Sequence, residues 1–236
     1  MNHVPAGRHA HPPRRRALRT FCWTTLALCA ALATEPASGQ SAAAEVTATA
    51  ADSTSPTSRI DALHASLLDV MKNAVKLGYE GRERQLAAVI PSYYDLDYMA
   101  QKSLGPHWNG ADAESRHRYL ETFTRFTIAN YAGRFDGYSG QSFETLGEEK
   151  APSGTAIVKS RLIDPEGENV ELNYRMRQVG GTWKIIDVYL NGTVSELALR
   201  RSEFVSIVKR DGLDALLVAL DAKIAKLAAG GELSAR

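Results

Sequence analysis

The residues best suited to chemistry outside the N-terminal region are three histidines and two closely spaced aspartates. The histidines are His64, His107 and His117, and no two of them have the four-residue spacing that lets two imidazoles share a metal on a helix. Asp95 and Asp97 could act as acid and base, but aspartates at such positions more often cap helices or form turns. We therefore predict no metal site and no catalytic residues.

Motifs for acyl or phosphate chemistry are also missing from the sequence. There is no G-x-S-x-G, no G-x-G-x-x-G and no P-loop. His117 stands between Arg116 and Arg118, which indicates a solvated helix face, and His64 adjoins an apolar helical stripe, which indicates a boundary position. We expect a protein that is not an enzyme and needs no cofactor.

Aromatic residues are dense between positions 93 and 143. They are Tyr93, Tyr94, Tyr98, Trp108, Tyr119, Phe123, Phe126, Tyr131, Phe135, Tyr138 and Phe143. Most of them are expected to pack in a core. Helices that carry such large side chains against the apolar face of a sheet can also leave a cavity with an aromatic mouth, the usual form of a site for a small apolar ligand.

Helical periodicity dominates the first half of the chain. Apolar residues recur at three- and four-residue spacing from 60 to 75, and a second helix is predicted for 82–90, stopping before or kinking at Pro91. A third covers about 96–102. Asp112 is the candidate N-cap of a fourth, for which Gly133 is the expected stop.

The period then changes to two, which predicts strands at 155–163, 169–179 and 182–190 and a weaker one at 142–148. In the strand at 169–179, Val170, Leu172, Tyr174 and Met176 alternate with Glu171, Asn173, Arg175 and Arg177. One face of the strand is therefore apolar and expected to be buried, and the other is polar and expected to face solvent. Two more helices are predicted, at 194–210 and 213–227. The fold class is α+β, with an antiparallel sheet of about four strands and helices before and after it.

The N-terminal region has the composition of an export signal. Arg14, Arg15, Arg16 and Arg19 precede an uncharged apolar run at 21–33, which is too short to span a bilayer comfortably. We predict a signal peptide at 1–39, with a membrane anchor as the alternative. A flexible tether at 40–58 and one folded domain at 59–230 follow.

Loss of the signal peptide changes the composition of the chain. It removes five arginines, one glutamate and both cysteines, so the formal net charge falls from +1 to −3. The remaining chain has no disulfide, and its charge indicates no nucleic-acid partner.

Several segments, in the same order, resemble the MlaC family, the periplasmic phospholipid-binding components of an ABC transport system, also called toluene-tolerance proteins. The segments are YYDLDYMAQKSLGPHW at 93–108, FTRF at 123–126 with Tyr131, IDPEG at 163–167 and WKIIDVYLNG at 183–192. The likeness covers about 60–220. The hopanoid-associated HpnM branch of the family is similar as well. The chain departs from the family pattern at 191–195, where two residues separate Gly192 from Ser195.

The resemblance implies an apolar pocket that encloses acyl chains and leaves the head group in solvent. The cargo would be a phospholipid or a hopanoid-type lipid. The partners would be an outer-membrane lipoprotein complex and an inner-membrane ABC transporter complex bearing an MCE-domain protein, and we expect a monomer. The predicted lipid-binding residues are Tyr94, Met99, Leu104, Trp108, Phe123, Phe126, Tyr131, Arg134, Val158, Leu172, Tyr174, Met176 and Val188. Arg134 is the expected contact of the head group at the rim.

Two other functions fit the same elements. An enzyme on an NTF2-like cone would also enclose a pocket, but it would need a polar acid–base pair inside, and the inward positions of strand 169–179 offer none. An interaction module of an envelope complex would instead have a filled core.

Overall fold

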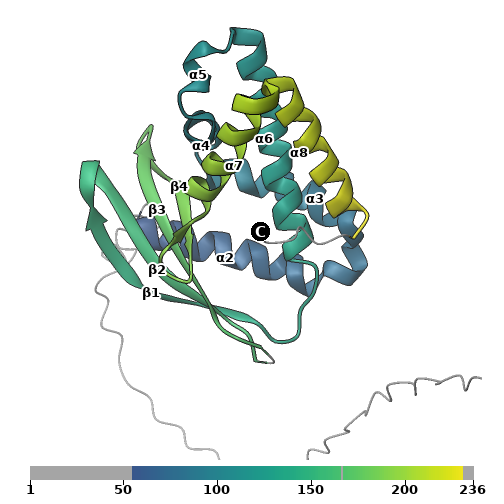
Figure 1. The fold of residues 1–236 in the computed structure, drawn as a ribbon. Coiled ribbons are helices and arrows are strands. Elements are labelled where there is room, and N and C mark those ends of the chain that lie inside the picture. The colour runs from purple at the N-terminus through teal and green to yellow at the C-terminus, as the bar shows by residue number, and fades with distance from the viewer. Residues whose placement is uncertain (1–54, 166, 231–236) are drawn as a thin grey trace, which may run out of the picture. The chain divides into compact units, whose positions relative to one another are not determined.

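The computed structural model describes residues 55–165 and 167–230. Five helices come first: α2 (Pro56–Lys72), α3 (Ala74–Tyr93), α4 (Leu96–Leu104), α5 (His107–Gly110) and α6 (Ala113–Arg134). The strands β1 (Ser142–Ala151), β2 (Thr155–Ile163), β3 (Val170–Val179), β4 (Thr182–Leu190) and β5 (Val194–Ser195) follow. Helices α7 (Glu196–Asp211) and α8 (Leu213–Ala228) complete the described part. The predicted α+β class is confirmed (Figure 1).

The strands form one antiparallel sheet in the order β1-β2-β3-β4-β5. Tyr174 on β3 pairs with Val158 on β2 and with Val188 on β4, so these three side chains share the inward face. The sheet has one strand more than the four expected. The extra strand is the two-residue β5, in which Val194 pairs with Leu190.

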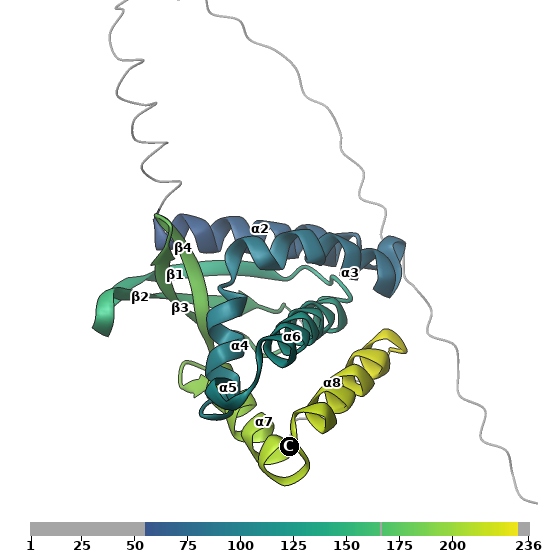
Figure 2. The same cartoon turned by 90° about the horizontal axis from the view of Figure 1, so that it is seen from above.

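Helices cover the inward face of the sheet in two layers. Helix α2 contacts β1 and β2, whereas α3, α4 and α7 contact β4. Helices α6 and α8 lie behind them, with α6 between α3 and α8 (Figure 2). Buried side chains from both layers form the core, among them Leu63, Leu86, Phe123, Met176 and Ile185. Burial of this apolar surface holds helices and sheet together.

Several predicted element boundaries are wrong. The helix predicted for 82–90 is α3, which passes through Pro91 and ends at Tyr93. Because Pro91 lies in the last turn, it removes a single backbone bond there and does not break the helix. The break occurs instead at Gly78, whose φ of 59° only glycine adopts easily.

Three further boundaries differ at the start or end of a helix. The predicted tether extends to 58, but α2 begins at Pro56, because the side chain of Ser55 caps it by accepting from the Ser58 amide at 3.0 Å. The helix predicted from 194 begins at Glu196, because Val194 and Ser195 pair with β4. Helix α6 ends at Arg134, one residue beyond the expected stop at Gly133.

The predicted signal peptide, 1–39, and residues 40–54 of the predicted tether lie outside the described residues. Among residues 55–165 and 167–230, no helix combines the length and the apolar character needed to cross a bilayer.

Candidate ligand-binding cavity

A cavity of about 500 Å³ lies between the sheet and the helices. This volume is within the range of sites that bind small molecules. Its sheet side is lined by Leu162, Val170, Leu172, Tyr174, Val188 and Leu190, joined by Met71 of α2. The register explains the grouping, since Leu162 pairs with Val170 and Leu172 pairs with Leu190. The sheet wall is therefore almost entirely aliphatic.

The helical side of the cavity is more polar. It is formed by Thr127, Asn130, Tyr131 and Arg134 of α6, Glu196 and Arg200 of α7, and Tyr94 and Met99 beside them. The segment after α6, residues 135–141, adds Asp136 and Tyr138, which like Arg134 are exposed. This segment and Asp164 therefore form the rim at which the cavity opens to solvent.

Seven of the thirteen predicted lipid-binding residues line the cavity: Tyr94, Met99, Tyr131, Arg134, Leu172, Tyr174 and Val188. The other six do not: Leu104, Trp108, Phe123, Phe126, Val158 and Met176. At the far end of the sheet, the Asp95 amide donates to the Ile185 carbonyl at 2.9 Å. This bond draws the α3–α4 junction onto the sheet, where Val158 and Met176 are fully buried. These side chains fill core space instead of lining an opening.

Four cavity residues that the sequence prediction missed come from α6 and α7: Thr127, Asn130, Glu196 and Arg200. The apolar pattern of a sequence does not show which polar residues a neighbouring helix turns inward. Leu162 and Leu190 were also missed, although strand alternation combined with hairpin register would have placed them beside Val170 and Leu172.

The tyrosines in the cavity wall are paired through their hydroxyls. The hydroxyls of Tyr94 and Tyr131 form a hydrogen bond, and the Tyr174 hydroxyl lies 3.1 Å from Nε2 of His64. Burial raises the pKa of Tyr94 and that of Tyr174 well above the ordinary value, because a buried phenolate loses its hydration. These side chains are neutral hydrogen-bonding groups inside an otherwise apolar space.

His64 is buried, not at a boundary as predicted. Its side chain stacks on Phe143 with ring centroids 4.0 Å apart, and the residue is 3% exposed. Burial lowers the pKa of His64 to about 4, since a charged imidazole would lose its hydration there. The ring is therefore neutral at neutral pH and supports Tyr174 from behind the cavity wall.

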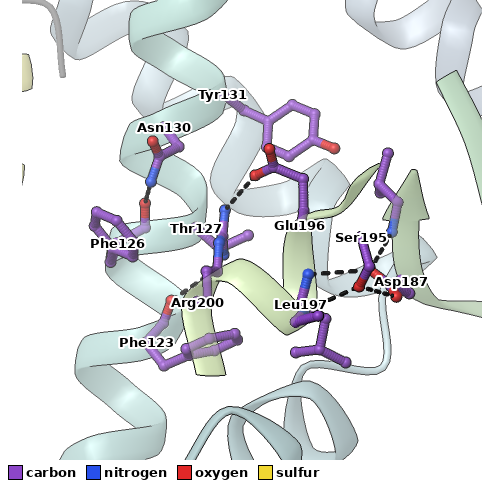
Figure 3. Close-up of polar contacts among 12 residues, drawn as sticks. Phe123, Phe126, Thr127, Asn130, Tyr131, Asp187, Ser195, Glu196, Leu197 and Arg200 are labelled. Atoms are coloured by element: carbon purple, nitrogen blue, oxygen red, sulfur yellow. Dashed lines mark hydrogen bonds and ion pairs between the residues drawn. The ribbon is translucent and has the colours of Figure 1, made fainter. Parts of the chain in front are cut away.

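Arg200 is held between α7 and α6 (Figure 3). Its Nη1 donates to Oγ1 of Thr127 at 3.3 Å, and its Nη2 lies 3.9 Å from the carboxylate of Glu196. The guanidinium carbon is 5.3 Å from the ring centroid of Phe126 and 5.8 Å from that of Phe123. Two predicted lipid-binding residues thus position a cavity cation.

Asp187 fixes the start of α7, the helix that carries Glu196 and Arg200. Its buried carboxylate accepts from the Ser195 hydroxyl at 2.6 Å and from the Leu197 amide at 3.1 Å (Figure 3). It also accepts from the Val188 amide at 2.8 Å. The first two of these charge-assisted bonds join β4 to the start of α7, and the third stays within β4.

Two of the other candidate chemical groups, Asp95 and His117, have structural partners. Asp95 accepts from the Tyr98 amide at the start of α4 and pairs with Arg177 at 2.5 Å, so it is the helix cap that its position favoured. His117 lies 3.3 Å from Glu121 on an exposed face. Within the described ranges, no three His, Cys, Asp or Glu side chains gather into a possible metal site.

The family model for the MlaC protein matches residues 61–222. This chain belongs to the MlaC family. The resemblance found in the sequence segments is thereby confirmed.

Two proteins of known name are similar to this chain in sequence. The intermembrane phospholipid transport system binding protein MlaC of Haemophilus influenzae is 28% identical over 129 residues, 53% of this chain and 60% of that protein. The toluene tolerance protein ttg2D of Pseudomonas putida is 26% identical over 138 residues, 58% of this chain and 61% of that protein. The chain thus matches about three fifths of the length of each.

A solved structure shares the fold. The phospholipid-binding protein of Ralstonia solanacearum, determined in complex with a phospholipid, superposes with a TM-score of 0.64 at 22% identity. The match covers 72% of this chain and 97% of that one. The architecture described above is therefore that of a known phospholipid-binding protein.

Proposed function

We propose that this protein is a lipid carrier that encloses the acyl chains of a phospholipid in the cavity between its sheet and its helices. The observation that carries the proposal is the cavity itself, whose wall of Leu162, Val170, Leu172, Val188 and Leu190 is aliphatic and whose rim is charged. The MlaC fold and the names of its relatives support the same function.

The physics of transfer across water fits this arrangement. Each methylene removed from water contributes about 0.8 kcal/mol, so a dozen contribute roughly 10 kcal/mol before the costs of binding. An apolar cavity wall provides this binding free energy without any catalytic group. Release then requires a partner that offers the lipid another apolar site or favours an open state of the cavity.

The partners in this proposal are an outer-membrane lipoprotein complex and an inner-membrane ABC transporter complex bearing an MCE-domain protein. The chain would move between them in the periplasm, after export by the signal peptide predicted at 1–39. A hopanoid-type lipid remains an alternative cargo.

The cavity is a better fit to a carrier than to the other two functions considered. An interaction module has no use for an unfilled interior. An enzyme would need an acid–base pair, and the one cavity carboxylate that is largely buried, Glu196, faces Arg200. Among the described residues, no second buried carboxylate and no histidine lines the cavity beside it to complete an acid–base pair.

Mass spectrometry of organic extracts from the purified protein tests the proposal. We expect a co-purified phospholipid in the wild type and its loss in Leu172→Asp, which places a carboxylate in the aliphatic wall. Val179→Asp is the matched control, because Val179 lies on the same strand but is 41% exposed. Equal lipid content in folded Leu172→Asp and Val179→Asp would contradict the carrier function.

A further inference from the structure

Arg200 is a cation in the wall of a cavity whose opposite wall is aliphatic. Its side chain is 15% exposed. A guanidinium carries five N–H donors. Among the residues that the structure describes, Arg200 donates one hydrogen bond, to Thr127, and at 3.3 Å this bond is long. Most of its donor capacity is therefore not used by the protein.

The nearest carboxylate does not use that capacity either. Glu196 lies 3.9 Å from Nη2, whereas a hydrogen-bonded guanidinium–carboxylate pair has N–O distances of about 2.7–2.9 Å. Glu196 thus balances the charge of Arg200 without occupying its donors. Thr127, Phe123 and Phe126 hold the guanidinium in place.

Further hydrogen-bonding groups lie close to Arg200. The hydroxyls of Tyr94 and Tyr131 face the same cavity. Burial raises the pKa of Tyr131, and the positive charge of Arg200 acts against that rise. The charge of Arg200 is therefore close enough to act on the tyrosine pair, and together they form a polar patch on the helical wall.

We infer that Arg200 binds the anionic oxygens of the lipid, with Glu196 as its counter-ion in the empty cavity. The inference rests on the proposed carrier function. The anion would be the phosphodiester of a phospholipid or the carboxylate of a fatty acid. The planar fork of arginine matches two such oxygens, and the attraction is stronger in a partly buried wall than at the exposed rim where Arg134 lies.

Binding of matched lipids to the delipidated full-length chain tests this. The probes are dioctanoyl phosphatidylglycerol and dioctanoylglycerol, which have the same tails with and without the phosphate. Calorimetry should show at least about tenfold tighter binding of the phospholipid, the effect of one hydrogen bond to a charged group. Dodecanoate against dodecanol provides the same comparison for a carboxylate and so identifies the source of the anion.

Arg200→Gln should lose this preference, so that it binds the charged and the uncharged member of each pair with equal affinity. Arg118→Gln is the control, since Arg118 lies on α6 outside this cavity and pairs with Asp214. A folded Arg200→Gln that still prefers the anion of both pairs would overturn the inference. Wild-type protein that binds the charged and uncharged probes equally would overturn it too, but would leave the carrier function standing. Binding of none of the four probes would remove both proposals.

Glu196→Gln provides a second, independent measurement. It removes the competing carboxylate from Arg200, so the preference for the anionic lipid should increase severalfold. If Arg200→Gln does not fold, Glu196→Gln tests the inference alone. An unchanged preference for the anionic lipid in Glu196→Gln would then overturn it.

Discussion

Single side chains in and around the cavity combine apolar shape with buried hydrogen bonds. Tyr174 lies among the aliphatic side chains of the sheet wall. Its hydroxyl needs a hydrogen-bond partner once water is excluded, and His64 is that partner. The histidine can do so only while it is neutral, because its ring is stacked on Phe143 away from solvent. The stability of this contact is therefore tied to pH.

We predict that the free energy of unfolding falls by about 3 kcal/mol between pH 7 and pH 4 through His64 alone. Its pKa is about 4 in the folded protein and 6.5 in the unfolded chain, so below pH 6.5 the unfolded state binds the extra proton. Urea denaturation across this range measures the effect. His64→Gln should lose this part of the pH dependence, and His117→Gln, at an exposed site, should keep it. The same slope in wild type and His64→Gln would contradict the assignment.

At the scale of elements, α7 contributes polar side chains to a cavity whose opposite wall, formed by the sheet, is apolar. It brings Glu196 and Arg200 to the cavity, and its orientation depends on Asp187 at the end of β4. The short strand β5 makes the connection rigid by pairing Val194 and Ser195 with β4. The helical wall is thus set by the β4–α7 junction.

Asp187→Ala should lower the free energy of unfolding by about 3 kcal/mol, because it leaves the Val188 and Leu197 amides without their acceptor. Thermal or urea denaturation measures the loss. Asp221→Ala is the control: Asp221 forms an exposed pair with Arg125, so its removal should cost less than about 1 kcal/mol. Equal losses in the two variants would show that Asp187 does not anchor the junction.

At the scale of the described fold, two helical layers leave space over one end of the sheet and close over the other. The α3–α4 junction sits on the sheet at Ile185 and fills that end. At the other end, the loop after α6 and Asp164 leave an opening. An unfilled interior has lost packing contacts that a ligand would restore.

A bound lipid should therefore stabilise the fold. At a free lipid concentration of 100 times the Kd, the free energy of unfolding should rise by about 2.7 kcal/mol. Urea denaturation of delipidated protein with and without dioctanoyl phosphatidylglycerol measures the increment. Val179→Asp should retain it and Leu172→Asp should lose it. An increment that persists in Leu172→Asp would place the lipid outside the cavity.

Sequence patterns alone determined the class of the fold and the inward face of the sheet. Alternation along 169–179 identified Val170, Leu172, Tyr174 and Met176 as the dry side of β3, because side chains in a strand must alternate between faces. Alternation also located β2 and β4, and residue type and position indicated the capping roles of Asp95 and Asp112. Segment likeness identified the MlaC family. These features are local, so short stretches of sequence contain them.

Only the tertiary structure decided where the inward face is filled and where it is open. Met176 and Leu172 look alike in the sequence, but the α3–α4 junction covers the first and leaves the second at the cavity. Arg200 has the pattern of a surface residue until α6 provides Thr127 as its partner. The burial of Met176 and the position of Arg200 both depend on packing between segments far apart in the chain, which local sequence periodicity does not predict.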